Sequence, residues 1–488
     1  MASGRRTSSR ARDARTSGGA GASPTDGSAR TATTQIAPMY KRLPHGPHRL
    51  ERNEVVLHQR ARIHGAMVEA VANNGYEGTS VKQVIGLAAV SRRSFYEQFA
   101  NKEECFLATF DLVVRRELKQ VRNAYIGTDG SLEERARAVF ARFADTAVDD
   151  RNATVLVVLE AQRVGPAGVL RVRRAAGICE HLLARAFVES PGATALPMPI
   201  VRAIAGGLHG IASAFLREEE HTHSSVDLAE EMLSWTLLFQ TPAAERTSER
   251  MAAGLAARVR EISSAHGHRL GGAEAPGRDE RTRLLQAVLR LVTREDYRTL
   301  SAPQIADEAN VSIDTCCELF ADKDECFLAA LDMIGDELLA IAADPLLVSD
   351  DWPQAVRRVL ARLMRYLADR PLQARTLAQE AFFAGDEALE HAVDLFHSIA
   401  TLLTEGAPTD AHGSLTTEAV AGAIWHTIRC QVTGGRIELL AALSDHLAYV
   451  VLAPFVGADA AVEIVFDERQ PVASASRDAC ETDALRST

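Results

Sequence analysis

The chain has few aromatic residues and no long, uninterrupted apolar run. Phe, Trp and Tyr make up 5% of its 488 residues, although hydrophobic residues as a whole make up 47%. Ala, Leu, Arg and Glu are common and β-branched runs are few, which favours helices and predicts an all-α fold. No apolar run approaches the roughly 20 residues that cross a bilayer, and the N-terminus lacks the apolar core of a signal peptide. We therefore expect no membrane partner and a cytoplasmic protein.

Catalytic and metal-binding motifs are also lacking. The sequence contains no nucleophile elbow, no Gly-rich phosphate loop and no HExxH, and its seven cysteines are scattered without CxxC spacing. We predict no enzyme activity, no catalytic residue, no cofactor and no metal site. The cysteines are typical of free or buried thiols in a reducing compartment. Cys105 and Cys326 each lie in an ECFLA segment, where packing on a helix face is expected.

Charge is distributed unevenly along the chain. The net charge is −11, but residues 1–125 carry 20 Lys or Arg and 11 Asp or Glu, so this part is +9. Residues 278–344 instead carry 7 basic and 15 acidic residues, a net charge of −8. A basic N-terminal part on an acidic remainder is typical of a nucleic-acid-binding head joined to another kind of body.

One sequence pattern occurs twice. TSVKQVIGLAAVSRRSFYEQFANKEECFL, from Thr79 to Leu107, returns as LSAPQIADEANVSIDTCCELFADKDECFL, from Leu300 to Leu328. The shared positions are helix caps and apolar residues, which predicts the same fold twice in two tandem units. The predicted division is a disordered basic arm (1–50), a first head (51–110), a helical body (111–245), a linker (246–280), a second head (281–332), a second helical body (333–466) and a disordered tail (467–488).

The first copy is predicted to be a helix-turn-helix. Asn74-Gly75 ends a first helix, Ser80 and Gln83 fit a capping box that opens the second, and Asn101 caps the fourth. In a helix-turn-helix the second helix of the motif enters the major groove. Phe95 on the predicted helix Arg92–Gln98, and Phe99 directly after it, face inward. The predicted DNA contacts are Arg92, Arg93, Ser94 and Gln98 to bases, and Thr79, Ser80, Tyr96 and Lys102 to phosphates.

The segments T-S-V-x-x-V, A-x-V-S-R-R-S-F-Y-E-Q-F and N-K-E-E resemble the DNA-binding segment of the TetR family of transcriptional regulators. The resemblance covers about 50 residues. It implies a three-helix head on a variable helical domain that binds a small molecule and dimerises through its last two helices. It also implies DNA contacts by Thr79, Arg92, Arg93, Ser94, Tyr96 and Lys102. Gly86 departs from the family, which usually has alanine there.

The second copy resembles the family less well. At the positions of Arg92, Arg93, Phe95 and Tyr96 it has Ile313, Asp314, Cys316 and Cys317, and we expect it to fold without binding DNA strongly. Each body ends in long apolar helices, predicted at 200–216 with 228–239 and at 415–432 with 439–451. By analogy, the two halves would pack as an internal pseudo-dimer; a homodimer of whole chains is the alternative.

The sequence thus predicts a DNA-binding transcriptional regulator, a repressor that responds to a small-molecule effector of unknown identity. The alternative is a ligand-sensing or protein-binding helical module with little direct DNA binding. The ligand-binding residues remain unknown at this stage. A few side chains have the chemistry to line a pocket, but a core or surface position is the more common explanation for each of them: His209, Trp235, His397, Trp425 and His426.

Overall fold

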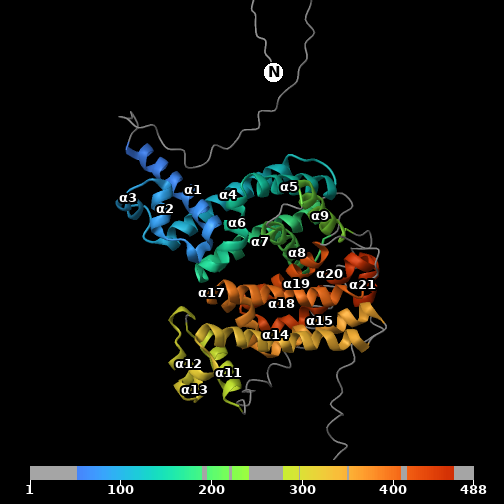
Figure 1. The fold of residues 1–488 in the computed structure, drawn as a ribbon. Helices are drawn as coiled ribbons and strands as arrows, with labels where there is room; N and C mark the ends of the chain where they lie inside the picture. The colour runs from blue at the N-terminus through green and yellow to red at the C-terminus, as the bar shows by residue number, and fades with distance from the viewer. Residues whose placement is uncertain are drawn as a thin grey trace, which may run out of the picture.

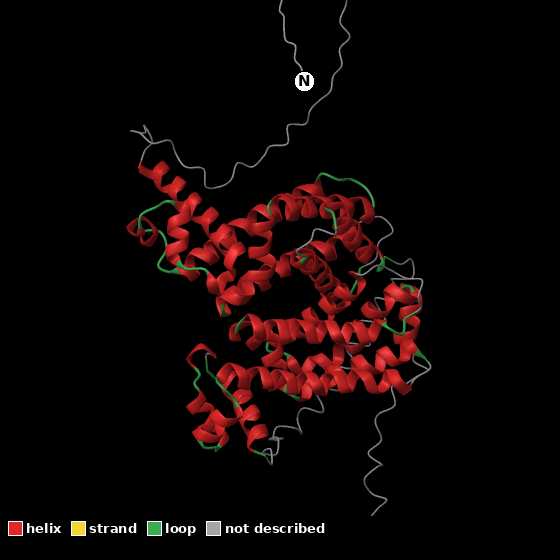
Figure 2. Ribbon diagram, in the orientation of Figure 1, coloured by secondary structure: helices red, strands yellow, loops and turns green. Residues whose placement is uncertain are grey.

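The computed structural model describes residues 52–189, 195–218, 223–240, 279–295, 297–348, 351–407 and 415–466. Every regular element within these ranges is a helix, as Figure 2 shows, so the all-α prediction is confirmed for them. The predicted arm, the predicted tail and nearly all of the predicted linker lie outside the described residues.

The N-terminal half consists of a first head and an N-terminal body. The head comprises α1 (Arg52–Gly78), α2 (Val81–Ala88), α3 (Arg92–Tyr96) and the start of α4 (Lys102–Ile126). The rest of α4 runs into the body, followed by α5 (Leu132–Asp149), α6 (Arg151–Val155), the π-helix η1 (Leu156–Glu160), the 3₁₀ turn η2 (Ala161–Val164), α7 (Pro166–Glu189), α8 (Met198–Arg217) and α9 (Ser225–Leu237).

The C-terminal half has a second head and a C-terminal body. The second head comprises α11 (Glu280–Val292), the 3₁₀ turn η3 (Tyr297–Thr299), α12 (Ala302–Ala309), α13 (Ile313–Leu319) and the start of α14 (Lys323–Val348). The body continues with α15 (Trp352–Asp369), α16 (Pro371–Arg375), the π-helix η4 (Thr376–Glu380), α17 (Ala381–Ala384), α18 (Asp386–Thr404), α19 (Leu415–Thr433), the 3₁₀ turn η5 (Ile437–Leu443), α20 (Ser444–Val456) and α21 (Ala458–Phe466).

The two heads lie on the same side of the molecule, one above the other in Figure 1, and the two bodies meet through α8, α19 and α20. The hydrophobic core has two parts. A small cluster fills the first head and includes Leu156 and Val164 of the N-terminal body. A much larger cluster runs without a break from the N-terminal body through the C-terminal body into the second head. The core of the first head is therefore separate from the core that joins the two bodies and the second head.

Two helical stretches pass the length and hydropathy test for a membrane span, contrary to the sequence prediction. They are Met198–Arg217 and Ile437–Val456, and 61% and 78% of their most apolar windows are buried inside the protein. Both belong to the contact region between the two bodies. Such burial is typical of core helices in a helical bundle, and length with composition alone is weak evidence for a membrane segment.

Backbone geometry at the end of α1 explains where the head turns. Gly75 has φ +66° and ψ 171°, which interrupts the helix at the predicted position. Gly86, in contrast, lies in regular helix on the exposed side of α2, and a Cβ added there would meet nothing within 4 Å. The backbone conformation requires glycine at Gly75 but not at Gly86, because residues with a Cβ rarely adopt a positive φ.

We expect Gly86→Ala to stabilise α2 by about 0.5–1 kcal/mol, because alanine restricts the unfolded chain and costs nothing sterically here. Hydrogen–deuterium exchange on the full chain would show slower exchange of the α2 amides. Gly75→Ala is the matched control and should instead speed exchange in the head. Equal effects of the two substitutions would contradict the backbone assignment.

Candidate nucleic-acid interface and ligand cavity

Caps fix the start of α2. The Ser80 backbone N–H donates to Gln83 Oε1 at 2.7 Å and the Gln83 N–H donates to Ser80 Oγ at 3.3 Å, which confirms the predicted capping box. The Thr79 hydroxyl donates to the Gly75 carbonyl at 2.7 Å and Thr79 is buried. The side chains of Thr79 and Ser80 therefore act within the protein in this structure.

The tight turn before α3 is held from α1. Ala89 lies in the left-handed region (φ 48°, ψ 48°), and Arg62 Nε donates to the Ala88 carbonyl at 2.8 Å. Ser91 then caps α3, accepting a hydrogen bond from the Ser94 N–H at 2.9 Å. The Ser94 hydroxyl lies 2.9 Å from the Ser91 hydroxyl, so it belongs to this cap. These contacts fix the orientation of α3 within the head.

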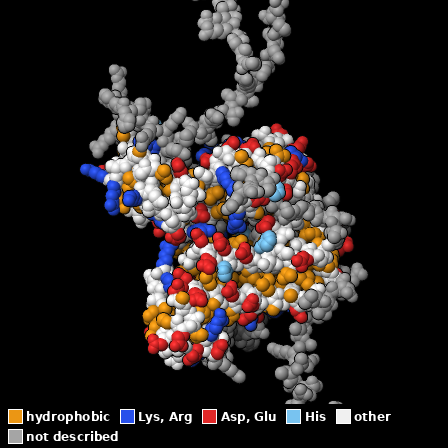
Figure 3. Space-filling model, in the orientation of Figure 1, with side chains coloured by type: hydrophobic (Ala, Val, Ile, Leu, Met, Phe, Trp, Pro, Cys, Tyr) orange, Lys and Arg blue, Asp and Glu red, His pale blue; other side chains and the backbone are white. Residues whose placement is uncertain are grey.

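α3 presents a basic and aromatic face. Phe95 and Phe99 are buried, as predicted, whereas Arg92, Arg93 and Tyr96 are exposed. The Arg92 guanidinium lies over the Tyr96 ring at 5.6 Å. Figure 3 shows Lys and Arg side chains gathered at this tip of the molecule. Guanidinium groups on a recognition helix are suited to guanine O6 and N7, and a phenol is suited to a phosphate.

The far end of the predicted recognition helix differs from the prediction. α3 ends at Tyr96, and Gln98 follows it, half-buried and with its Oε1 atom shielded from solvent. Arg93 Nε pairs with Glu97 Oε1 at 2.8 Å, and both side chains are well exposed. An exposed pair of this kind contributes little energy, so Arg93 can leave Glu97 for a base at small cost. The half-buried Gln98 side chain cannot move to a base at a similarly small cost.

Lys102 holds the head together from inside. Its Nζ donates to the Tyr76 carbonyl at 2.9 Å and lies 4.1 Å from the centre of the Tyr76 ring. Burial lowers the pKa of this lysine. Tyr76 is also tied to the body, because its backbone N–H donates to Glu160 Oε2 at 2.7 Å. Lys102, predicted as a phosphate contact, thus also links α4, the end of α1 and the π-helix η1.

The second head has the same internal contacts with a different outer face. Lys323 Nζ donates to the Tyr297 carbonyl at 2.9 Å and lies 4.5 Å from its ring centre. Asn310 takes the left-handed conformation at the end of α12, and Ser301 with Gln304 forms a capping box. On α13, however, Ile313, Asp314 and Cys317 are exposed. This surface offers a carboxylate and apolar groups where α3 offers guanidiniums.

A cavity of about 360 Å³ lies in the N-terminal body. Its wall is mostly apolar and comes mainly from α4, α5, α7 and α8, with contributions from η1, η2 and α9, and α19 of the other half lines it as well. Among the candidates from the sequence, His209, Trp425 and His426 line it. Trp235 is instead buried, donating to the Ile204 carbonyl at 3.0 Å, and His397 pairs with Glu418 at 3.0 Å on the surface. An apolar wall with a few polar groups is typical of a small-molecule site.

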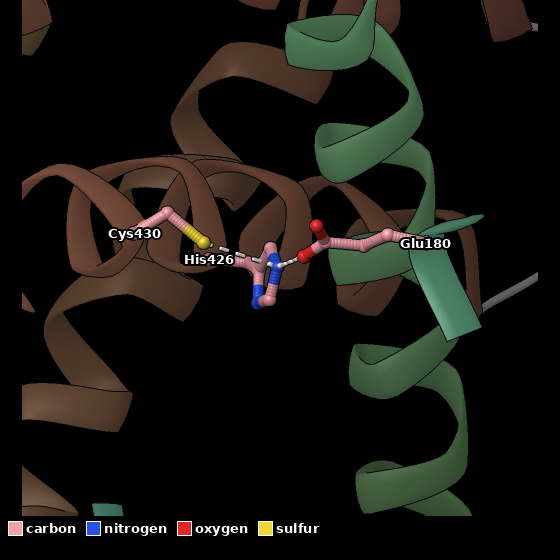
Figure 4. Close-up of side chains that lie close together, drawn as sticks. All are labelled: Glu180, His426 and Cys430. Carbon is pink, nitrogen blue, oxygen red and sulfur yellow. Dashed lines mark hydrogen bonds and ion pairs between the residues drawn. The ribbon is translucent and has the colours of Figure 1, made fainter. Parts of the chain in front are cut away.

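The polar end of the cavity brings together residues that are far apart in the sequence (Figure 4). His426 Nε2 lies 3.0 Å from Glu180 Oε1 and 3.3 Å from Cys430 Sγ. Arg202 Nε donates to the other oxygen of Glu180 at 3.2 Å. Glu180 is buried. Burial opposes the charged form of His426, but Cys430 and Glu180 outweigh it and raise its pKa to about 9.

These three side chains are the one group of possible metal ligands found among the described residues. Their ligand atoms all lie within 4.8 Å of one another. Thiolate, imidazole and carboxylate are zinc ligands. Sequence reasoning selected His426 but not Glu180 or Cys430. The spacing of His426 and Cys430, four residues apart on one helix, was a usable signal for the second of them, whereas nothing marked Glu180.

Acid is expected to destabilise the first head through His64. This buried side chain lies with Nδ1 2.7 Å from the Thr109 hydroxyl, which itself donates to the Cys105 carbonyl at 2.8 Å. Because the Thr109 hydroxyl proton is used there, His64 Nδ1 is the donor to Thr109. Burial, and then Arg60 and Arg115, lower its pKa from 6.5 to about 4. The unfolded chain then takes up the proton first, so stability is lost as the pH falls from about 6.5 to about 4.

The loss should reach up to about 3 kcal/mol at the acid end. Hydrogen exchange of the α1 and α4 amides across this pH range would measure it. His64→Asn keeps a donor toward Thr109 without the titrating ring and should flatten the pH dependence. An unchanged dependence in that variant would mean that other groups cause the acid effect.

Comparison with known proteins identifies the head. Residues 66–109 match the family model described as bacterial regulatory proteins, tetR family. The first head is thus similar to the DNA-binding segment of that family. The match covers α2, α3 and parts of α1 and α4, which are the elements that carry Arg92, Arg93 and Tyr96. It supports the predicted DNA-binding transcription regulator. No curated protein sequence matches the chain.

Two solved structures are similar to part of the chain. The fatty acid degradation regulator FadR from Bacillus halodurans is 18% identical, with a TM-score of 0.34, over 37% of this chain and 94% of its own. The transcriptional regulator FadR from Bacillus subtilis, in complex with stearoyl-CoA, is 18% identical, with a TM-score of 0.32, over 36% of this chain and 96% of its own.

Proposed function

We propose that this chain is a ligand-responsive, sequence-specific transcriptional repressor of the cytoplasm that reads the major groove with α3. The observation that carries the proposal is the exposed set Arg92, Arg93 and Tyr96 on a helix whose inner side chains and caps are fixed. In this proposal, Ser94 and the N-terminal amides of α2 contact the DNA backbone. Thr79, Ser80, Gln98 and Lys102 position the head, and any contact they make with DNA is through groups left free by that role.

We further propose that the two halves are tandem copies of one unit, packed as an internal pseudo-dimer. The π-helices support this, since η1 and η4 both end in glutamate and are followed five residues later by a glycine with positive φ, Gly165 and Gly385. The contact of α8 with α19 supports it too. Aligning Ala205-Gly206 with Ala421-Gly422 places Gly210 opposite His426 in the alignment. In this alignment Gly206 corresponds to Gly422, and Gly210 corresponds to His426. The close pair Gly206–His426 therefore maps onto the close pair Gly422–Gly210, as expected for two units related by a two-fold axis.

In this arrangement only one head reads DNA. Asp314 and Ile313 occupy the outer face of α13, where a carboxylate would lie against phosphates and base acceptors. The heads also contact each other, because Arg298 Nη2 lies 3.2 Å from Glu77 Oε1. The acidic second head thus supports the first and limits its orientation rather than adding a second half-site contact.

The effector site is the cavity of the N-terminal body, and η1 connects it to the reading head. Val157, Val158 and Gln162 line the cavity in and beside η1, while Glu160 of the same π-helix accepts the hydrogen bond from the Tyr76 N–H. A ligand that displaces η1 changes the position of Glu160 and therefore of the Tyr76–Lys102 contact. The effector shifts the population of head orientations by its differential affinity for them.

A footprint on the DNA upstream of its own coding region tests the proposal, together with light scattering of the purified chain. A monomer that protects one half-site is the expected result. Two inverted half-sites protected by a dimer would replace the pseudo-dimer with a homodimer of whole chains. The absence of any footprint at low salt would overturn DNA reading altogether.

The acidic C-terminal half favours a second candidate, a ligand-sensing or protein-binding module that uses DNA little. The two candidates differ in the salt dependence of DNA affinity. A reading head that contacts several phosphates gives a steep negative slope of affinity against salt, whereas the module gives a slope near zero.

A further inference from the structure

Cys430 differs from the other cysteines in the described residues because it has an imidazole beside it and a cavity in front of it. Its Sγ lies 3.3 Å from His426 Nε2, and both residues line the cavity. The two side chains lie one turn apart on α19, so the helix itself fixes their distance. Figure 4 shows the sulfur and the Glu180 carboxylate on either side of the same ring nitrogen.

The charges around this nitrogen define its protonation. Nε2 lies within hydrogen-bond distance of both Cys430 Sγ and Glu180 Oε1. When His426 takes up the thiol proton, the resulting imidazolium lies between the sulfur and the carboxylate, and both contacts favour that form. Burial by itself would raise the pKa of Cys430, but His426 lowers it below its ordinary value. Thiolates are the reactive form of cysteine, and a neighbouring imidazolium produces them.

Cys179 provides a comparison within the same cavity. It lines the wall beside Glu180 but has no imidazole partner among the described contacts. Cys179 keeps solvent exposure, yet desolvation by its apolar surroundings, and then the Glu180 carboxylate, raise its pKa to about 11. Two thiols thus face one cavity with opposite shifts, and only the thiol on α19 is activated.

We propose that Cys430 is a nucleophile that captures α,β-unsaturated carbonyl compounds whose hydrocarbon part occupies the cavity. The class follows from three features on one surface: a mostly apolar wall, a thiol paired with an imidazolium, and Arg429 lining the same end. The inference deepens the effector response put forward above and rests on it for its biological meaning.

The chemistry balances without an oxidant or a reductant. The thiolate forms a bond to the β-carbon, the π electrons move toward the carbonyl oxygen, and the resulting enolate takes the Nε2 proton of His426 at its α-carbon. The product is a thioether beside a neutral imidazole. Both charges of the Cys430–His426 pair are then gone, so the contact between His426 on α19 and Glu180 on α7 loses its ionic character. The adduct therefore weakens a link between the two halves of the chain.

A divalent metal is the rival occupant of the same three side chains. Two guanidiniums oppose it. Arg202 already donates to Glu180 at 3.2 Å, and the half-buried Arg429, which neighbours Cys430 in the sequence, lines the cavity. Anionic groups, including the enolate that forms during capture, are stabilised next to these cations, while a dication is repelled.

Alkylation of the full chain by N-phenylmaleimide tests the proposal, with the saturated N-phenylsuccinimide as the unreactive control. Cys317 is exposed on α13 and Cys480 lies outside the described residues, so the assay uses a Cys317→Ser, Cys480→Ser background. Peptide mass mapping over time should show Cys430 modified at least about 10-fold faster than Cys179, since each unit of pKa changes the thiolate fraction about tenfold.

Two further variants separate activation from exposure. His426→Gln should slow modification of Cys430 about 10-fold while leaving Cys179 and the helical circular dichroism unchanged. Cys430→Ser should abolish the fast adduct. Faster modification of Cys179, or no effect of His426→Gln, would overturn the proposal. Stoichiometric binding of Zn²⁺ that blocks alkylation would overturn it in favour of a metal site. The assay contains no DNA, so a failed footprint and a failed alkylation remain distinguishable.

Discussion

Arg93→Ala and Tyr96→Ala should each lower affinity for the cognate DNA by about 10-fold or more, whereas Asp314→Ala should leave it unchanged. A good arginine–guanine pair provides about 1–3 kcal/mol of discrimination, and the phenol adds a phosphate contact. All three side chains are exposed and lie outside the two cores, so their loss should not unfold either head. Fluorescence anisotropy on the footprinted DNA measures the effect.

The same titrations distinguish base reading from charge. If Arg93 reads a guanine, Arg93→Ala weakens cognate DNA much more than unrelated DNA, and the salt slope changes little. If Arg93 only contacts a phosphate, both DNAs lose affinity equally and the slope falls by about one. Glu97→Gln is the matched control for the exposed pair, since it frees Arg93 without removing it. A loss after Asp314→Ala equal to that after Arg93→Ala would contradict the assignment of one reading head.

The sequence predicted the local structure of the first head well because its signals act over a few residues. Ser80 with Gln83, Asn101 and Gly75 each specify a cap or a turn through their own backbone contacts, and the structure has all three. Phe95 and Phe99 were placed inward by their spacing of four. The end of α3 was misplaced, because a short helix has too few residues for periodicity to locate its boundary.

The cavity could not be predicted from the sequence, for a different physical reason. Glu180 and His426 are 246 residues apart, and their meeting depends on how α7 and α19 pack. Burial of Glu180 is visible only once the partners that compensate its charge, His426 and Arg202, are in place. The role of Lys102 was hidden similarly, because its contact with Tyr76 depends on the kink at Gly75. Local pattern thus located the exposed face of α3, while the polar end of the cavity required long-range packing.

The contact between the two halves should be sensitive to small substitutions. Gly206, Gly210 and Gly422 let the backbones of α8 and α19 approach closely. A Cβ added at Gly422 would lie 2.4 Å from the Gly206 carbonyl oxygen and 2.9 Å from Gly210 Cα. A Cβ added at Gly210 would lie 2.3 Å from the Glu418 carbonyl oxygen. These neighbours are backbone atoms, which cannot rotate away as a side chain can.

Gly422→Ala should therefore destabilise the chain by about 1–3 kcal/mol, because the two helices must move apart along the core that joins the bodies. Thermal unfolding, followed by circular dichroism, would show the lower midpoint. Gly177→Ala on α7, where an added Cβ meets nothing within 4 Å, is the matched control and should be neutral or slightly stabilising.

The double variant Gly210→Ala, Gly422→Ala tests whether both substitutions act on the same contact between α8 and α19. Once one methyl group has separated α8 from α19, the second enters space that is already open, so the combined loss should be smaller than the sum of the single losses. Separation should also widen the part of the cavity that α19 lines and remove His426 from Glu180. If the two losses simply add, or if Gly422→Ala behaves like Gly177→Ala, then α8 and α19 do not cross as closely in solution as they do here.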